Sequence, residues 1–460
     1  MASNVYFLND RAGRTEESIQ YKGIKVLRDA GIEQFIKKGD RVGVKIHMGE
    51  WGNSLNMRPH WVSTIVEEVK RLGGIPSVVE GSVIPGGPFA SRSHASDHLE
   101  TARHHGFTEE TLGCPIVILD GDMGLDDEAV PVEHGVYMKS TRMAAKVRDF
   151  DKFIVVSHFK GHQMGVFGGG IKNVGIGMCS ARGKMAVHNL TNKEIGFRTW
   201  KLNPQVVAKY DQMKHPNIVD MMIMTCPQNA FARKGAEVLR DNSKCSQCGY
   251  CFAWLAMGMF QLPPELYPSW PPAIADSAAG IINAVGKENW MFLNYAMDIT
   301  PGCDCNDYHD AAMIPNIGVF ASKDPVACDM ACIEAAEARA AVPGSKADEY
   351  GFGAPNTERF TNCTTAAKTS QWAQINSAVY NGLGTSEYNL VKSEPLPANT
   401  FLPEMWTLTD NLFSRYKAFY STVDMDCGDY AYAMDDIKMT REELAKKPKG
   451  KVGEQSIKDL

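Results

Sequence analysis

Hydrophobic and polar positions in the first half of the chain follow two alternating periods. Short runs rich in β-branched residues predict buried strands at residues 41–47, 75–80, 114–120 and 152–158. Between the first two runs, apolar residues recur at helical spacing and stop at a pair of glycines; they are Val62, Ile65, Val66, Val69 and Leu72. Strands alternating with helices are typical of an α/β fold with a mostly parallel sheet. Several runs end at polar residues, where open parallel sheets carry their sites.

The second half of the chain is less regular. Residues 217–224 predict a further strand, and the Pro-rich stretch 262–272 predicts a surface excursion. Residues 317–341 predict a strand, a turn and a helix, with Asp324 as the N-cap and Pro325 in the first helical position. Periodicity weakens from about Glu394, and the last twenty residues resemble a solvated tail.

Composition and charge narrow the class of protein. A chain of 460 residues is too long for one ordinary core, and 44% hydrophobic with 22% charged residues is typical of soluble globular proteins. The net charge of −6 argues against binding to nucleic acid or to an anionic membrane. With no signal-like N-terminus and no apolar run of about 18 residues, we expect a cytoplasmic protein. The 12 cysteines are then expected as thiols and metal ligands, because that compartment keeps thiols reduced.

The segment 244–255, KCSQCGYCFAWL, carries Cys245, Cys248 and Cys251 at C-x2-C-x2-C spacing. Two-residue loops bring successive thiolates onto one face of a [4Fe-4S] cube, so this spacing predicts an iron–sulfur cluster. Tetrahedral zinc is the main alternative, and unligated core thiols are the third. Bacterial ferredoxins have another cysteine after three intervening residues, where this chain has Leu255. The pattern favours a single cluster whose fourth ligand comes from elsewhere in the chain.

Two regions offer that fourth ligand. We favour Cys303 or Cys305, because a Gly-flanked C-x-C in a polar loop is an improbable way to build a core. Cys226 is the other candidate, with an equally good interpretation as a buried residue at the end of a strand. An open iron that binds substrate is a further alternative. Two other cysteines, Cys328 and Cys332, share a helix face and are expected to fill space against the sheet.

A second candidate site lies in residues 157–188. Seven glycines between Gly161 and Gly177 follow a predicted strand, so backbone N–H groups are expected to approach an anionic or bulky ligand there. From this stretch we assign cofactor binding to Gly168, Gly169 and Gly170. It is not a nucleotide-triphosphate loop, because Ile171 stands where such a loop has lysine.

The same segment is rich in groups that transfer protons or hold charge; these are His158, Lys160, His162, Lys172, Arg182, Lys184 and His188. The alternative interpretation is a basic surface loop. Lys45, His47 and Arg58 follow the strand at 41–47 and are expected to line the same crevice, with Lys172, as cofactor-binding residues.

These motifs resemble the domain-of-unknown-function 362 family, whose members include ferredoxin-like iron–sulfur proteins. The resemblance rests on VKIHMGEWGNSLNMRP, VEGSVIPGG, SHFKGHQMGVFGGGIKNVGIGMCS, the three-cysteine run and CDCNDYHDAAMIPNIGVFASKDPVACDMA, over about residues 45–331. This chain departs from many ferredoxin-bearing members, because it has one cysteine run and Leu255.

A more remote similarity is to the nickel-pincer lactate racemases. In that family a lysine tethers the pincer cofactor, a histidine before it is an acid/base and a later histidine binds the metal. Carried over, the resemblance implies those roles for Lys172, His162 and His188, which stand ten and sixteen residues apart. Ile171 replaces the arginine that the racemases have before the lysine.

The sequence as a whole predicts two α/β lobes with mostly parallel sheets and a small inserted cluster segment. We expect an N-terminal domain (1–225), a cysteine insertion (226–300), a C-terminal α/β part with the C-x-C motif (301–395) and a helical extension with a tail (396–460). The expected function is an iron–sulfur oxidoreductase in which the cluster delivers electrons to a small anionic substrate or cofactor. In that role His162, His188 and Lys172 are catalytic, and Cys245, Cys248 and Cys251 with Cys303 or Cys305 bind metal.

Three other functions remain open: a racemase or isomerase with a Lys172-linked metal cofactor, a non-catalytic electron carrier or maturation partner, and a zinc-stabilised binding module. The expected partner is a redox protein such as a ferredoxin or a reductase. An additional organic, nickel or flavin cofactor and the oligomeric state are left undecided by the sequence.

Overall fold

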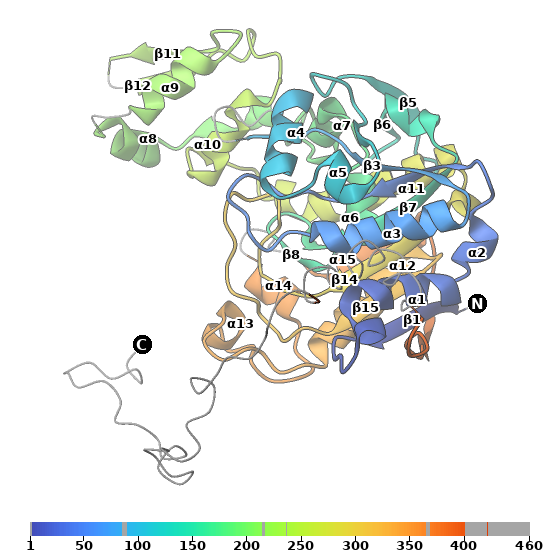
Figure 1. The fold of residues 1–460 in the computed structure, drawn as a ribbon. Coiled ribbons are helices and arrows are strands. Elements are labelled where there is room, and N and C mark those ends of the chain that lie inside the picture. The colour runs from blue at the N-terminus through green and yellow to red at the C-terminus, as the bar shows by residue number, and fades with distance from the viewer. Residues whose placement is uncertain are drawn as a thin grey trace. The chain divides into compact units, whose positions relative to one another are not determined.

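The computed structural model describes residues 2–84, 90–213, 217–235, 237–364, 369–400 and 421 (Figure 1). The chain divides into two units, Met1–Ala398 and Asn399–Leu460. All features below lie in the first unit. The predicted extension and tail lie, apart from residues 396–400 and 421, outside the described residues.

Eight strands among the described residues form one mixed, mostly parallel sheet in the order β16-β1-β15-β14-β7-β2-β3-β4. Their bounds are β1 Ser3–Asn9, β2 Arg41–Lys45, β3 Ile75–Glu80, β4 Ile116–Ile118, β7 Lys152–His158, β14 Trp290–Ala296, β15 Gly318–Ser322 and β16 Tyr388–Lys392. Strand β15 runs antiparallel to β1 and β14, and the other neighbours are parallel. The predicted α/β fold is confirmed.

The central strands bury side chains on both faces. In β7, Ile154 and Val156 belong to one hydrophobic core, whereas Phe153 and Val155 belong to the other. This split follows from the two-residue period of a strand, and it explains why the run reads as continuously apolar in the sequence.

Helices cover each face of the sheet (Figure 1). One core includes residues of α1 (Ile19–Asp29) and α3 (Pro59–Arg71). The other core includes residues of α6 (Gly170–Gly175), α11 (Leu266–Val285), α12 (Pro325–Glu337) and α15 (Trp372–Tyr380). Cys328 and Cys332 are buried in this second core, as predicted. The Asp324 carboxylate accepts the backbone N–H groups of Val326 and Ala327, so the predicted N-cap is confirmed.

A third, smaller core holds together the segment that carries the cysteine run. Its elements include α8 (Pro204–Asp211), α9 (Ile218–Thr225), α10 (Ala253–Ala256), the ribbon of β10 (Lys201–Leu202) with β13 (Phe260–Gln261), and the ribbon of β11 (Phe231–Lys234) with β12 (Glu237–Arg240). The remaining elements are α2 Ile32–Phe35, α4 Ala95–His104, α5 Glu109–Leu112, α7 Ala181–Val187, α13 Lys346–Glu349, α14 Arg359–Cys363, the ribbon β5 Asp127–Pro131 with β6 Ser140–Ala144, and the ribbon β8 Lys160–His162 with β9 Val166–Gly168.

Two sequence predictions about this region are wrong. Residues 217–224 were expected as a strand, but they form most of α9, because the Asn217 side chain caps the backbone N–H groups of Val219 and Asp220. Residues 262–272 were expected as a surface excursion, but α11 begins at Leu266. Leu266 and Trp270 lie one helical turn apart and are both buried, and this packing offsets the N–H groups that the prolines remove.

Among the described residues, no helix is both long enough and apolar enough to cross a membrane.

Candidate functional site

A cavity of about 760 Å³ lies at the carboxyl ends of the parallel strands. His47 follows β2, Glu80 ends β3, and His162 and Lys172 follow β7. The loop after β14 contributes residues 301–302 and 305–310. Because parallel strands end at one edge, residues far apart in sequence meet there. The lining also includes the largely apolar side chains of Leu255, Met257, Tyr267 and Trp270.

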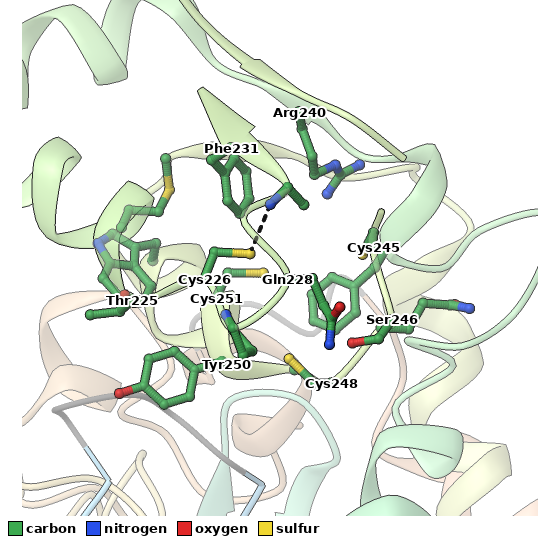
Figure 2. A pocket seen from close by; sticks show the side chains of 17 residues that line it. Thr225, Cys226, Gln228, Phe231, Arg240, Cys245, Ser246, Cys248, Tyr250 and Cys251 are labelled. Carbon is green, nitrogen blue, oxygen red and sulfur yellow. Dashed lines mark hydrogen bonds between the residues drawn. The ribbon is translucent and has the colours of Figure 1, made fainter. Parts of the chain in front are cut away.

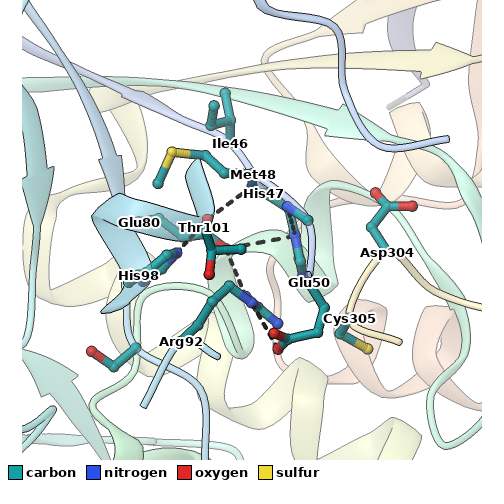
Figure 3. Close-up of polar contacts among 12 residues, drawn as sticks. Ile46, His47, Met48, Glu50, Glu80, Arg92, His98, Thr101, Asp304 and Cys305 are labelled. Carbon is teal, nitrogen blue, oxygen red and sulfur yellow. Dashed lines mark hydrogen bonds and ion pairs between the residues drawn. The ribbon is translucent and has the colours of Figure 1, made fainter. Parts of the chain in front are cut away.

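A buried ionic network forms one side of this cavity (Figure 3). The Arg92 guanidinium contacts the Glu50 carboxylate at 3.1 Å and the Glu80 carboxylate at 3.5 Å. His98 contacts the Glu80 carboxylate at 3.2 Å. Among the described residues, Arg92 Nη2 is buried without a hydrogen-bond partner, as is the hydroxyl of Ser82. Both residues line the cavity, so two buried donors without partners lie in its wall.

His162 and His188, both predicted as catalytic, line the cavity in different tautomers. His162 Nδ1 accepts the backbone N–H of Gly165 at 2.6 Å, so its proton is on Nε2. His188 Nδ1 lies 2.6 Å from the carbonyl of Lys184 and donates to it, so its lone pair is on Nε2. Burial lowers the pKa of His162 to about 4 and that of His188 to about 3, and nearby Lys172 adds to both shifts. Both rings are therefore neutral at neutral pH.

The Cys303–Cys305 loop is held against the cavity by its middle residue. The Asp304 carboxylate accepts a hydrogen bond from Lys160 Nζ at 2.8 Å and contacts His158 Nδ1 at 2.9 Å. This pairing fixes the sulfur atoms of Cys303 and Cys305 beside His162, and one ligand atom from each of the three residues lies within 4.8 Å of the others. The group is compact enough to hold one metal ion.

Lys172 reaches the same loop. Its Nζ donates to Cys303 Sγ at 3.5 Å, and the backbone N–H of Cys305 donates to the same sulfur at 3.4 Å. Burial alone would raise the pKa of Cys303. The hydrogen bond from the Cys305 thiol and the ammonium groups of Lys172 and Lys160 instead hold that pKa well below its usual range.

The other predicted cofactor-binding residues lie in different places. Lys45 is fully buried and donates to the carbonyl of Ile46 at 2.6 Å and to Asn173 at 2.8 Å. His47 lines the cavity, and the backbone N–H of Gly49 donates to its Nδ1 at 3.0 Å, which leaves its proton on Nε2. Arg58 is not in the cavity lining, and its guanidinium contacts Asp298 at 2.6 Å.

Gly168, Gly169 and Gly170 are not in the cavity lining either. The backbone N–H groups that we expected to face a ligand donate within the protein: those of Gly170 and Ile171 bind the Asp329 carboxylate at 2.7 and 3.0 Å. An added Cβ at Gly169 would lie 2.3 Å from that carboxylate. The glycines therefore let the start of α6 pack on α12, and Asp329 occupies the position of the expected anion.

The cysteine run forms a separate small pocket with a fourth cysteine (Figure 2). Cys226, at the end of α9, lines this pocket of about 20 Å³ together with Cys245, Cys248 and Cys251. The backbone N–H of Ala230 donates to Cys226 Sγ at 3.3 Å. Burial raises the pKa of Cys251 to about 12, and the charges of the three other cysteines act in the same direction. The fourth cysteine in this pocket is thus Cys226. The two cysteines that the sequence favoured as the fourth ligand lie elsewhere: Cys305 lines the large cavity, and Cys303 is buried next to it.

The pocket and the cavity share a wall. Gly249 lies in the pocket lining, and an added Cβ there would be 3.3 Å from Ile84, which lines the cavity. Leu255, four residues after Cys251, also lines the cavity. The linings of the four-cysteine pocket and of the large cavity therefore contact each other, although they come from different parts of the chain.

Residues 42–334 match the family described as Domain of unknown function (DUF362). The chain belongs to this family. A solved structure similar to this DUF362 protein is the lactate racemase apoprotein from Thermoanaerobacterium thermosaccharolyticum, with a TM-score of 0.36 and 11% identity over 73% of this chain and 58% of the racemase chain. The DUF362 protein thus spans less than two thirds of the racemase, and among curated proteins none matches it.

Sequence reasoning missed several residues of the DUF362 site. Glu50, Glu80 and Arg92 form the buried network, but each is a common surface residue type. For Glu80 a signal was present, because it ends a predicted strand at the edge where sites form. Asp304 was also overlooked, although an aspartate between two cysteines in a polar loop is an unusual pattern.

Proposed function

We propose that this DUF362 protein is an iron–sulfur oxidoreductase that binds a small organic anion in the large cavity. The observation that carries this proposal is the shared wall between the four-cysteine pocket and a cavity lined by His162, Lys172 and His188. In this proposal Cys226, Cys245, Cys248 and Cys251 hold one [4Fe-4S] cluster. When bound, the cluster supplies one-electron transfer to the cavity.

The donor set fits an iron–sulfur cluster better than a single zinc ion. Four zinc-bound thiolates at about 2.3 Å would bring their sulfur atoms to about 3.8 Å from one another. Among the described residues, the compact group of three ligand atoms within 4.8 Å is His162, Cys303 and Cys305. Among the described residues, the four-cysteine pocket contributes no group of three ligand atoms that is this compact.

The cavity fits a substrate with an anionic and an apolar part. The unpartnered donors of Arg92 and Ser82 suit a carboxylate or a similar oxyanion. Trp270 and Met257 offer an apolar surface in the cavity lining. His188 Nε2 suits a proton acceptor and His162 Nε2–H a proton donor, so the two rings can act in opposite directions at neutral pH.

Electrons would enter at the cysteine run. Cys248 is exposed, which favours a docking redox protein such as a ferredoxin or a reductase at this side of the cluster pocket. The partner and a cytoplasmic location remain proposals.

Anaerobic purification, with iron, sulfide, zinc and nickel analysis and EPR before and after dithionite, tests the cluster. About four iron and four sulfide per chain are expected in the wild type. Cys226→Ala should lose the EPR signal, and the matched control Cys303→Ala should keep it. One zinc without sulfide, or loss of the cluster in the control and not in Cys226→Ala, would reject the assignment.

A racemase or isomerase with a Lys172-linked metal cofactor is the second candidate. It is favoured by two observations, of which the first is that His162, Lys172 and His188 line a single cavity, as the racemase resemblance requires. The donation from His188 Nδ1 to a backbone carbonyl is also the arrangement usual for metal-bound imidazoles. A mass increase on the peptide containing Lys172, together with about one nickel per chain, would support this candidate over the oxidoreductase.

A further inference from the structure

We propose that Cys303 and Cys305 form a redox-active dithiol–disulfide pair that exchanges with small thiols and disulfides entering the cavity. The pair is separate from the four-cysteine pocket and does not depend on the proposed cluster. The two sulfur atoms lie within 4.8 Å of each other on residues separated only by Asp304. Side-chain rotation can close such a gap to the S–S distance of about 2.05 Å.

The two cysteines differ in access. Cys305 lines the large cavity, whereas Cys303 is buried and absent from the cavity lining. In thiol–disulfide exchange one sulfur must meet the external reagent and the second must reach the first. The geometry assigns the attacking role to Cys305 and the resolving role to Cys303.

Hydrogen-bond donors surround the pair. Lys172 Nζ and the backbone N–H of Cys305 donate to Cys303, the Gln163 amide donates to Cys305 Sγ at 3.8 Å, and His162 Nε2 is 3.7 Å from Cys305 Sγ. Because His162 Nδ1 already accepts the N–H of Gly165, its Nε2 carries a proton and faces the sulfur as a donor. Donors stabilise a thiolate, which is the reactive form of cysteine.

The same contacts disfavour a metal ion at this group. A ligating imidazole presents a lone pair to the metal, but the tautomer of His162 presents N–H. A cation bound to Cys303 would also lie close to the Lys172 ammonium, which is 3.5 Å from that sulfur.

The exchange reaction starts from a reduced pair in which one cysteine is a thiol and the other is a thiolate. The proton of the Cys305 thiol first moves to Cys303, and the Cys305 thiolate then attacks one sulfur of an organic disulfide RSSR, which forms a mixed disulfide and releases RS⁻. Cys303 then attacks the Cys305 sulfur, closes the internal disulfide and releases the second RS⁻. The remaining thiol proton passes to one of these thiolates, so RSSR gains two electrons and one proton and the dithiol is oxidised.

The protein's own tryptic peptides provide the assay and an internal control. Residues 288–323 contain Cys303 and Cys305, and the adjacent peptide 324–339 contains Cys328 and Cys332. Peptide 324–339 is the control, because Cys328 and Cys332 are buried and burial raises the pKa of both thiols. The wild-type protein is equilibrated anaerobically in buffers of reduced and oxidised dithiothreitol, quenched with acid, denatured, alkylated and analysed by mass spectrometry.

In reducing buffers we expect peptide 288–323 to be alkylated at both cysteines. In oxidising buffers it should carry an internal disulfide, with a mass lower by two hydrogens than the unalkylated peptide. The disulfide fraction should follow a two-electron Nernst curve against the potential of the buffer. Peptide 324–339 should stay doubly alkylated throughout. With hydroxyethyl disulfide, Cys303→Ser should accumulate a stable mixed disulfide at Cys305, and Cys305→Ser should react at least tenfold more slowly. Lys172→Met should make the pair more reducing, because the ammonium no longer stabilises the reduced thiolate form.

Two results would overturn the proposal. One is that peptide 288–323 keeps both thiols in every buffer in which the control peptide 324–339 keeps its own. The other is a stoichiometric metal ion that Cys303→Ser and Cys305→Ser both lose while Cys226→Ala retains it. Neither result bears on the cluster, whose iron content and EPR signal are read in the same preparations.

Discussion

The backbone of Gly249 packs directly against Met185, so that an added Cβ would lie 2.4 Å from the Met185 sulfur. Gly249 lies between Cys248 and Cys251 and has φ of +84°, a left-handed backbone conformation that residues other than glycine adopt only at an energetic cost. Glycine at this position therefore lets the backbone of the cysteine run approach Met185 this closely without strain.

Gly249→Ala should destabilise the protein and lower its metal occupancy. The left-handed backbone costs about 1–2 kcal/mol, and the clash with Met185 adds about 1–3 kcal/mol. Gly258→Ala is a matched control, because Gly258 has φ of +72° in the same segment with nothing within 4 Å of an added Cβ. Denaturant unfolding of the two variants separates the steric cost from the backbone cost. Equal losses would show that the close approach to Met185 is unimportant.

Lys45 should make stability depend on pH in the alkaline range. Burial lowers its pKa to about 7, whereas an unfolded lysine titrates near 10.4. Between these values the unfolded chain binds more protons than the folded one, so this residue makes stability rise with pH. In Lys45→Met the slope between pH 7 and 9 should be smaller by up to about 1.4 kcal/mol per pH unit. An unchanged slope would mean that Lys45 is charged in the folded protein.

Asp304→Asn should destabilise the protein strongly. The carboxylate is buried between Lys160 and His158, and its removal leaves the buried Lys160 ammonium without its charged partner, at a cost of about 3–5 kcal/mol. Asp310→Asn, in an exposed position of the same loop, is the control and should change stability by less than about 0.5 kcal/mol. Chemical denaturation measures both. A small effect of Asp304→Asn would mean that the pairing does not hold the Cys303–Cys305 loop.

Two tryptophans allow a test of the helix that the sequence missed. Trp270 Nε1 donates to the buried carbonyl of His188 at 2.7 Å, and Trp372 Nε1 donates to the exposed Glu358 at 2.7 Å. Trp270→Phe removes a hydrogen bond to a buried carbonyl and should cost about 1–3 kcal/mol more than Trp372→Phe. Thermal unfolding compares the two. Similar shifts would indicate that water reaches the His188 carbonyl.

The strands and the N-cap at Asp324 could be predicted, because burial on alternating faces and capping are local in sequence. The errors came where distant packing decides the outcome. Residues 217–224 have a strand-like composition, but the Asn217 cap and a small separate core make them helical. Prolines near Trp270 suggested a loop, but the burial of that side chain against residues of the third core favours a helix.

The residue types of the candidate site could be predicted from the sequence, but which of these residues lie together in the fold could be predicted less well. Cysteine spacing identified Cys245, Cys248 and Cys251, but spacing contains no information on a ligand that arrives through α9 and the β11–β12 ribbon. Cys226 is adjacent to the run only because that ribbon folds back. Similarly, Gly168–Gly170 look like an anion site until Asp329, 159 residues after Gly170, is brought to their N–H groups.

The sheet order has a consequence for biosynthesis. Strand β1 is translated before the other seven strands of the sheet, yet it pairs with β15 and β16, which lie at residues 318–322 and 388–392. It therefore has no neighbour to pair with until nearly the whole first unit has been translated. Unpaired strands in slowly completed sheets are prone to aggregation, so β1 is exposed to this hazard during synthesis until β15 has followed it.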